Sequence, residues 1–177
     1  MIFRNYIRKT CGFYVSEYHL VTMLLPHIVT KVEKGVKIDT ILNKDIKQEI
    51  KDLVSKLNIN DITKAKILNI NWEKIKETDF NHIKNYMEEV VRDNTDIEII
   101  INGTKEEIDL VNKNIEYWLD MNIEKIEGIH INIINCYEVS EFNSNLNSIL
   151  NENEYIINTS GEYPVEQMYE SHKKKAI

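Results

Sequence analysis

The sequence contains few of the residues that usually join or break domains. Only two prolines and five glycines occur in 177 residues, and no stretch rich in proline, glycine and serine interrupts the chain. Interdomain linkers are commonly built from such stretches. We therefore expect a single domain over residues 1–177, with a core over about residues 10–161 and a helical tail over 162–177.

Cysteines and long apolar runs are also scarce. Cys11 and Cys136 are the only two cysteines, whereas small secreted proteins use several as disulfides. No apolar run approaches the roughly 18 residues that a membrane helix needs. Residues 1–10 are polar and have no signal-peptide core. These absences predict a cytoplasmic protein with reduced thiols and no membrane partner.

The chain lacks the glycine motifs that bind nucleotides. A P-loop needs G-x-x-x-x-G-K-[ST] between a strand and a helix, so that backbone N–H groups and a lysine hold phosphate. The first such join reads VSEYHL from Val15, with no glycine or lysine, and Glu17 adds a negative charge that repels phosphate. The dinucleotide fingerprint G-x-G-x-x-G and the hydrolase elbow G-x-S-x-G are absent as well. We therefore expect no nucleotide and no other cofactor.

Metal-binding spacings and an excess of positive charge are missing too. None of the five histidines is paired at H-x-x-x-H spacing, and no C-x-x-C occurs, so no metal site is predicted. The net charge of −7 disfavours nucleic acid as a partner. Hydrophobic residues make up 42% and charged residues 29% of the chain, a balance typical of a globular domain.

Short Ile/Val-rich runs alternate with amphipathic helical segments along the chain. Strands are predicted over residues 11–15, 36–42, 66–71, 97–101, 129–135 and 155–158. Helices are predicted after the candidate caps Ser16, Asn43, Asp79, Thr104 and Ser140, and from Pro164 into the lysine run 173–175. Such alternation is typical of an α/β three-layer sandwich with a mostly parallel central sheet of about six strands, RecA/Rossmann-like in outline.

Ligands of such sheets bind outside the carboxyl ends of the strands. Because these ends meet at one edge, residues far apart in sequence are expected to gather there. The candidate ligand- or partner-binding residues are Ser16, Glu17, His19, Trp72, Asn102, Thr104, Tyr137 and Ser160. The expected partner is a protein or a small molecule.

Two further functions stay open. One is an enzyme whose site is assembled at this edge, with Cys136 or His19 as the reactive group and Glu17 or Glu138 as acid or base. The other is a structural component of a homodimer or larger homo-oligomer. Because no recognised catalytic set occurs, we expect no catalytic residues and favour a non-catalytic regulatory role.

The order of motifs resembles the MEDS domain, the sensory domain named for methanogens and methylotrophs, whose RecA-like sheet lacks a working P-loop. Four segments carry the resemblance. The first two are the opening strand and turn, CGFYVS from Cys11, and the central strand and turn over residues 97–104. The last two are the late strand INIINCY from Ile131 and the closing helix and strand with Phe142, Leu146, Leu150 and YII from Tyr155. The resemblance implies a stand-alone sensory domain that signals through a partner.

Overall fold

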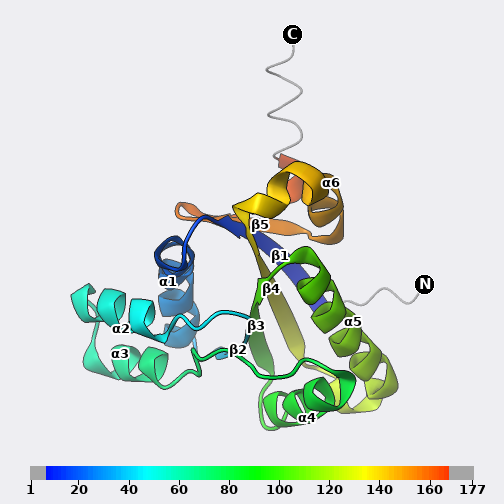
Figure 1. The fold of residues 1–177 in the computed structure, drawn as a ribbon. Helices are drawn as coiled ribbons and strands as arrows, with labels where there is room; N and C mark the ends of the chain where they lie inside the picture. The colour runs from blue at the N-terminus through cyan, green and yellow to red at the C-terminus, as the bar shows by residue number, and fades with distance from the viewer. Residues whose placement is uncertain (1–6, 168–177) are drawn as a thin grey trace.

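The chain folds around one six-stranded sheet in the order β2-β3-β4-β1-β5-β6 (Figure 1). The structure is a computed structural model and describes residues 7–167, apart from the side chains of residues 142 and 143. The strands are β1 (Ile7–Tyr14), β2 (Lys37–Leu42), β3 (Asp96–Gly103), β4 (His130–Glu138), β5 (Tyr155–Asn158) and β6 (Gly161–Pro164). The first five are parallel, and β6 pairs antiparallel with β5.

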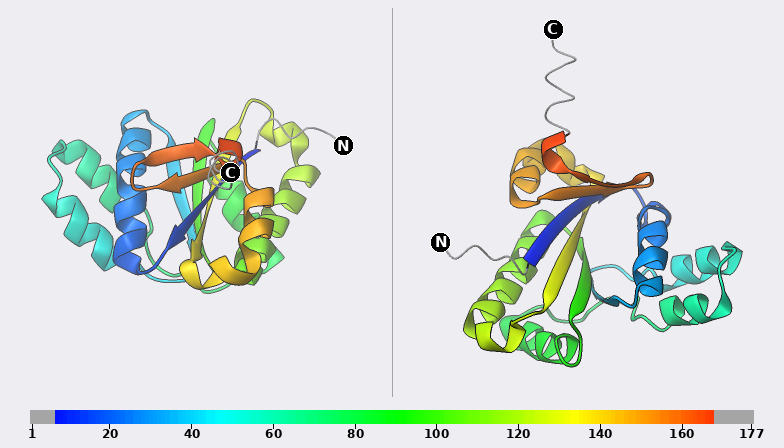
Figure 2. Two further views of the ribbon diagram at one scale, coloured as in Figure 1. Left: turned by 90° about the horizontal axis from the view of Figure 1, so that it is seen from above. Right: turned by 180° about the vertical axis from the view of Figure 1, so that it is seen from behind.

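Helices cover both faces of the sheet, as the two views of Figure 2 show. One face packs against α1 (Glu17–Glu33), and α2 (Lys47–Lys56) and α3 (Asp61–Leu68) pack on the outer side of α1. The other packs against α4 (Phe80–Val90), α5 (Lys105–Met121) and α6 (Phe142–Glu152). Two short 3-10 helices, η1 (Ile123–Ile126) and η2 (Val139–Glu141), complete the elements. The predicted α/β three-layer sandwich of RecA/Rossmann type is confirmed.

Local sequence explains where several helices begin. The Ser16 hydroxyl accepts the His19 backbone N–H at the start of α1. Thr104 and Glu107 form the predicted capping box of α5, in which each side chain accepts a backbone N–H of the other residue. Between β2 and β4, β3 is buried on both faces from Ile97 onward, as its mostly apolar run predicts.

One predicted strand is wrong. Residues 66–71 are not extended, because Lys66 to Leu68 close α3 and the following residues form a turn. Asn60 begins this helix by accepting the Thr63 backbone N–H at 2.7 Å. A short apolar run cannot be assigned to strand or helix by its periodicity. The sheet still has the predicted number of strands, because β6, which was not predicted, adds one strand where the wrong prediction removes one.

Other boundaries also differ from the prediction. Strand β1 begins at Ile7 and not at residue 11. Helix α2 begins at Lys47 with no side-chain cap, so Asn43 is not its N-cap. Residues 162–164 belong to β6, so the predicted tail is not helical from residue 162. The helix predicted from Pro164 is present over residues 165–167, and segment 168–177 lies outside the described residues. The side chain of Phe142 lies outside them as well. In the described part of the chain, no helix is long and apolar enough to cross a membrane.

Candidate functional site

The strand order places a topological switch point between β1 and β4. The chain leaves β1 through α1 on one face of the sheet and leaves β4 through α6 on the other. Tyr14 and Glu138 are paired neighbours where these two strands end. Such a divergence opens a crevice at the carboxyl edge, and this is the place where α/β sheets bind ligands.

A cavity of about 310 Å³ lies at this point, and we call it the switch-point crevice. Its lining residues come from the ends of β1, β2 and β4 and from the first turn of α1: Tyr14, Val15, Ser16, Glu17, Lys44, Glu138, Val139 and Ser140. Val15 and Val139 are 70% and 46% exposed, so apolar surface lies beside the polar interior. The crevice therefore offers charge and aliphatic contact together.

Three charged side chains converge in the crevice. The Lys44 ammonium lies 3.4 Å from a Glu17 carboxylate oxygen and also forms an ion pair with Glu138. The hydrogen bond to Glu138 is the main reason that the pKa of Lys44 is raised. The three side chains together carry two carboxylates and one ammonium, so they have one net negative charge at neutral pH.

Tyr14 carries a buried hydroxyl with no hydrogen-bond partner among the described residues. Its side chain lines the crevice and is only 1% exposed. Burial first, and then the charge of Glu138, raises the pKa of Tyr14, so the phenol stays protonated. Buried polar groups are nearly always hydrogen-bonded. An unpaired one in the wall of a crevice therefore marks a place where a ligand or a water completes the structure.

Asn102 fixes the segment that carries Lys44. Its side-chain oxygen accepts the backbone N–H of Asn43 at 2.7 Å and that of Lys44 at 3.4 Å. The Asn43 side chain in turn donates to Glu107, which belongs to the α5 capping box. Asn102 is 2% exposed, and its amide nitrogen has no partner among the described residues. The position of Lys44 therefore depends on the end of β3 and on the start of α5.

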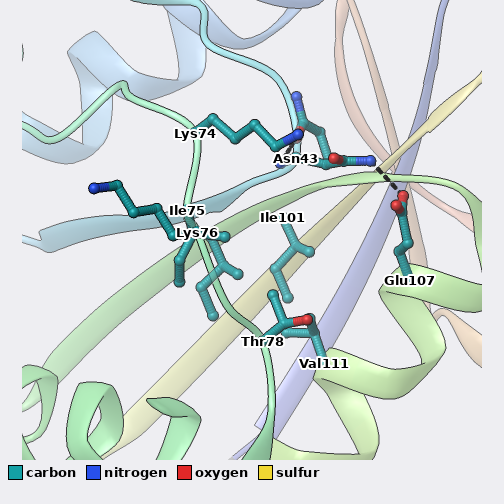
Figure 3. A pocket seen from close by; sticks show the side chains of 10 residues that line it. Asn43, Lys74, Ile75, Lys76, Thr78, Ile101, Glu107 and Val111 are labelled. Atoms are coloured by element: carbon teal, nitrogen blue, oxygen red, sulfur yellow. Dashed lines mark hydrogen bonds between the residues drawn. The ribbon is translucent and has the colours of Figure 1, made fainter.

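A second hollow of about 240 Å³ lies on the other side of this segment (Figure 3). Ile75, Ile101 and Val111 form its apolar part, and Lys74 and Lys76 come from the connection that precedes α4. The Ile75 backbone N–H donates to the Leu42 carbonyl at 2.8 Å, which holds this connection against the end of β2. This hollow lies beside β2 and β3, away from the switch point.

The structure brings only some of the predicted site residues together. Ser16 and Glu17 line the crevice. Asn102, near the end of β3, holds the segment that carries Lys44, and Thr104 is the N-cap of α5. His19 is used locally, because its Nδ1 accepts the Val15 backbone N–H at 3.1 Å.

Three other predicted site residues lie elsewhere. Trp72 is 2% exposed and donates its indole N–H to the Ile67 carbonyl, so it is a core residue and does not line an open edge. Tyr137 is buried on the opposite face of the sheet, in the core beneath α5 and α6. Ser160 lines a separate hollow beside the middle of α1.

Lys44 and Tyr14 were missed by the sequence analysis. Lys44 is the second residue after β2, and the rule that nominated the other strand ends applies here too. A helix cap at Asn43 would make Lys44 the first helical residue, so the sequence gives no reason to place it at the sheet edge. Tyr14 reads as an ordinary strand residue, and no sequence signal shows that its hydroxyl lacks a partner.

Cys136 does not line the crevice. Cys136 has no exposed surface, and burial raises the pKa of its thiol, which keeps it protonated. This weighs against the enzyme hypothesis that used Cys136.

Potential metal ligands gather at another place. In the described part of the chain, the only group of three or more such atoms lying within 4.8 Å of one another is the exposed cluster Glu77, Asp79 and His82. His82 already pairs with Glu77 at 2.9 Å and with Asp79 at 2.5 Å. Exposed clusters of this kind are ordinary surface features, and this one lies outside the crevice.

No protein-family model matches the sequence, and no curated protein matches it well enough to count as a relative. The resemblance to the MEDS domain therefore stays a prediction, as do the expected cytoplasmic location and the homodimer alternative. What the fold and the site define is an α/β sandwich with a charged crevice at its switch point.

Proposed function

We propose that this chain is a non-catalytic sensory or regulatory domain, which binds a small molecule or a protein partner in the switch-point crevice and signals by contact. The observation that carries the proposal is the cavity at the switch point, where charged side chains from three segments meet and whose lining includes Tyr14, a residue with a buried hydroxyl that has no partner among the described residues.

The connections of the crevice support a regulatory role. Its charged groups belong to three separate segments, the start of α1, the turn after β2 and the end of β4. A ligand that contacts these side chains would connect all three segments at once. Val15 and Val139 lie at the surface beside the ligand, where a partner could sense its presence.

The test is a binding screen read out residue by residue. ¹⁵N-labelled protein is titrated with fractions of a cell extract while backbone amide shifts are followed. We expect one active fraction to move the amides of Tyr14, Glu17 and Glu138 while most others stay in place. Ser160→Ala, which alters a different hollow, is the matched control and should leave the response unchanged.

Two results would refute the proposal. One is a screen in which active fractions move amides elsewhere and never those of the crevice. The other is turnover of a substrate at a rate that Glu17→Gln or Glu138→Gln abolishes, which would favour the enzyme hypothesis instead.

A further inference from the structure

Lys44 lies where a ligand cation would be held. Its ammonium is the common partner of Glu17 and Glu138, which reach it from two different elements. We propose that the switch-point crevice recognises an ammonium or guanidinium group, and that Lys44 is an internal cation which such a ligand displaces. This inference rests on the proposed function and names the ligand chemistry of the same site.

The charge balance favours a cation over an anion. Glu17 and Glu138 outnumber Lys44, and Glu107 also contributes negative potential at the Tyr14 hydroxyl. A phosphate or carboxylate would have to approach these carboxylates, and Lys44 alone would attract it. Ca²⁺ takes roughly six to eight oxygen ligands, more than the two carboxylates here supply. A monovalent organic cation fits the site best.

A comparison within the chain indicates that Lys44 can be displaced. Lys105 also bridges two carboxylates, Asp109 at 2.7 Å and Glu152 at 3.0 Å, but only 10% of its side chain is exposed. The Lys44 side chain is 45% exposed, and its partners are 37% and 38% exposed. Exposed ion pairs stabilise proteins little. Moving Lys44 into water therefore costs far less than moving Lys105.

The surroundings provide the remaining contacts. Tyr14 lines the crevice, and its hydroxyl oxygen has lone pairs that no described residue uses. Because this oxygen is buried, it accepts an N–H only from a cation that penetrates the crevice wall. Val15 and Val139 offer exposed apolar surface to an aliphatic chain attached to the cation. The Lys44 side chain itself consists of an aliphatic chain that ends in an ammonium group. A ligand of similar shape would place its ammonium group where that of Lys44 lies and its aliphatic chain against the two valines.

The experiment uses n-butylammonium, which has the shape and charge of the end of a lysine side chain. Its dissociation constant is measured by amide shift titration at low ionic strength for the native protein and for Lys44→Ala. Because an exposed ion pair contributes up to about 1 kcal/mol, removal of the competitor should tighten binding by up to about fivefold. Lys44→Gln serves as a second variant, and circular dichroism confirms that both are folded.

The matched control is Lys47→Ala. Lys47 pairs with Glu73 on the surface, with a side-chain exposure close to that of Lys44, but does not line the crevice. We expect this variant to bind n-butylammonium as the native protein does. Glu138→Gln in the Lys44→Ala background should weaken binding several-fold. Tyr14→Phe should weaken it as well, without loss of stability in the absence of ligand.

Parallel titrations separate the possible outcomes. Butanol and butyrate test the uncharged and anionic forms of the same chain, and the peptides Gly-Lys-Gly and Gly-Gln-Gly test whether a protein side chain can supply the cation. Preference for n-butylammonium or for the lysine peptide supports the inference. Which of the two binds more tightly shows whether the cation comes from a small molecule or from a protein side chain. If butyrate or butanol moves the crevice amides and the cations do not, the cation inference is overturned while ligand binding at the crevice stands. If all probes fail and extract fractions act elsewhere, both proposals fail.

Discussion

Replacing Asn102 with alanine should destabilise the protein and release the segment that carries Lys44. The Asn102 side-chain oxygen is the acceptor for the Asn43 backbone N–H at 2.7 Å and, more weakly, for that of Lys44 at 3.4 Å. Asn102 is 2% exposed, so water does not replace this acceptor freely. Leaving a buried donor unpaired costs about 1–3 kcal/mol.

We expect Asn102→Ala to lower the free energy of unfolding by about 2–3 kcal/mol, most of it from the shorter bond. For a chain of this length, 1 kcal/mol corresponds to about 2–4 °C in Tm. The melting temperature should therefore fall by about 4–12 °C. Urea unfolding followed by far-UV circular dichroism measures the first quantity, and a thermal scan measures the second.

Hydrogen exchange gives the sharper test, because it shows where the effect lies. In Asn102→Ala the backbone amide of Asn43 should lose its protection more than amides in the middle of β3. The control is Asn43→Ala, which removes the partly exposed side-chain bond to Glu107 but keeps both backbone bonds to Asn102. It should cost less than about 1 kcal/mol. Equal stability losses in the two variants, or an unchanged exchange rate at Asn43, would refute the reasoning.

Three further predictions concern two sets of core residues and one half-buried carboxyl group. Trp72→Ala should lower the free energy of unfolding, measured in urea, by about 3–5 kcal/mol, as expected for a buried aromatic residue. A variant that keeps its stability and loses only ligand binding would restore Trp72 as a site residue. Burial raises the pKa of the Asp39 carboxyl, so its ionised form opposes folding above the folded-state pKa, and that cost disappears as the pH falls through it. Asp39→Asn should therefore be more stable than the native protein at pH 7 and lose the advantage in acid, and the opposite order in urea titrations would contradict this sign. Cys11 and Cys136 have no exposed surface, and burial raises the pKa of Cys11 to about 12. Ellman's reagent should therefore label neither thiol until urea unfolds the chain. Rapid labelling of Cys136 in the native state would reopen the enzyme hypothesis.

The sandwich could be predicted because each layer has a local signature. The run over residues 97–101 is apolar at nearly every position, which is what a strand buried on both faces requires. The start of α5 was predictable for a similar reason, since a capping box involves side chains only three residues apart. These features depend on neighbours in sequence and survive without knowledge of the tertiary contacts.

The errors have a tertiary origin. The segment that ends α3 has the composition of a short strand, but Ile67 packs into the core beneath α1 and its carbonyl accepts the indole N–H of Trp72. Asn43 has the character of a helix cap, yet its amide bonds to Glu107, which lies 64 residues away in the chain. In both cases a distant partner outweighed a weak local preference.

The sequence by itself determined the alternation of strands and helices, the absence of a phosphate loop and the position of Ser16 and Glu17 at a strand exit. Periodicity, capping and motif spacing depend on residues close together in the chain, so one sequence suffices to detect them. Only the tertiary structure decided that β1 lies beside β4, that Lys44 meets Glu17 and Glu138, and that the Tyr14 hydroxyl has no partner among the described residues. Strand order and side-chain pairing arise from contacts between distant segments, and these contacts created the site.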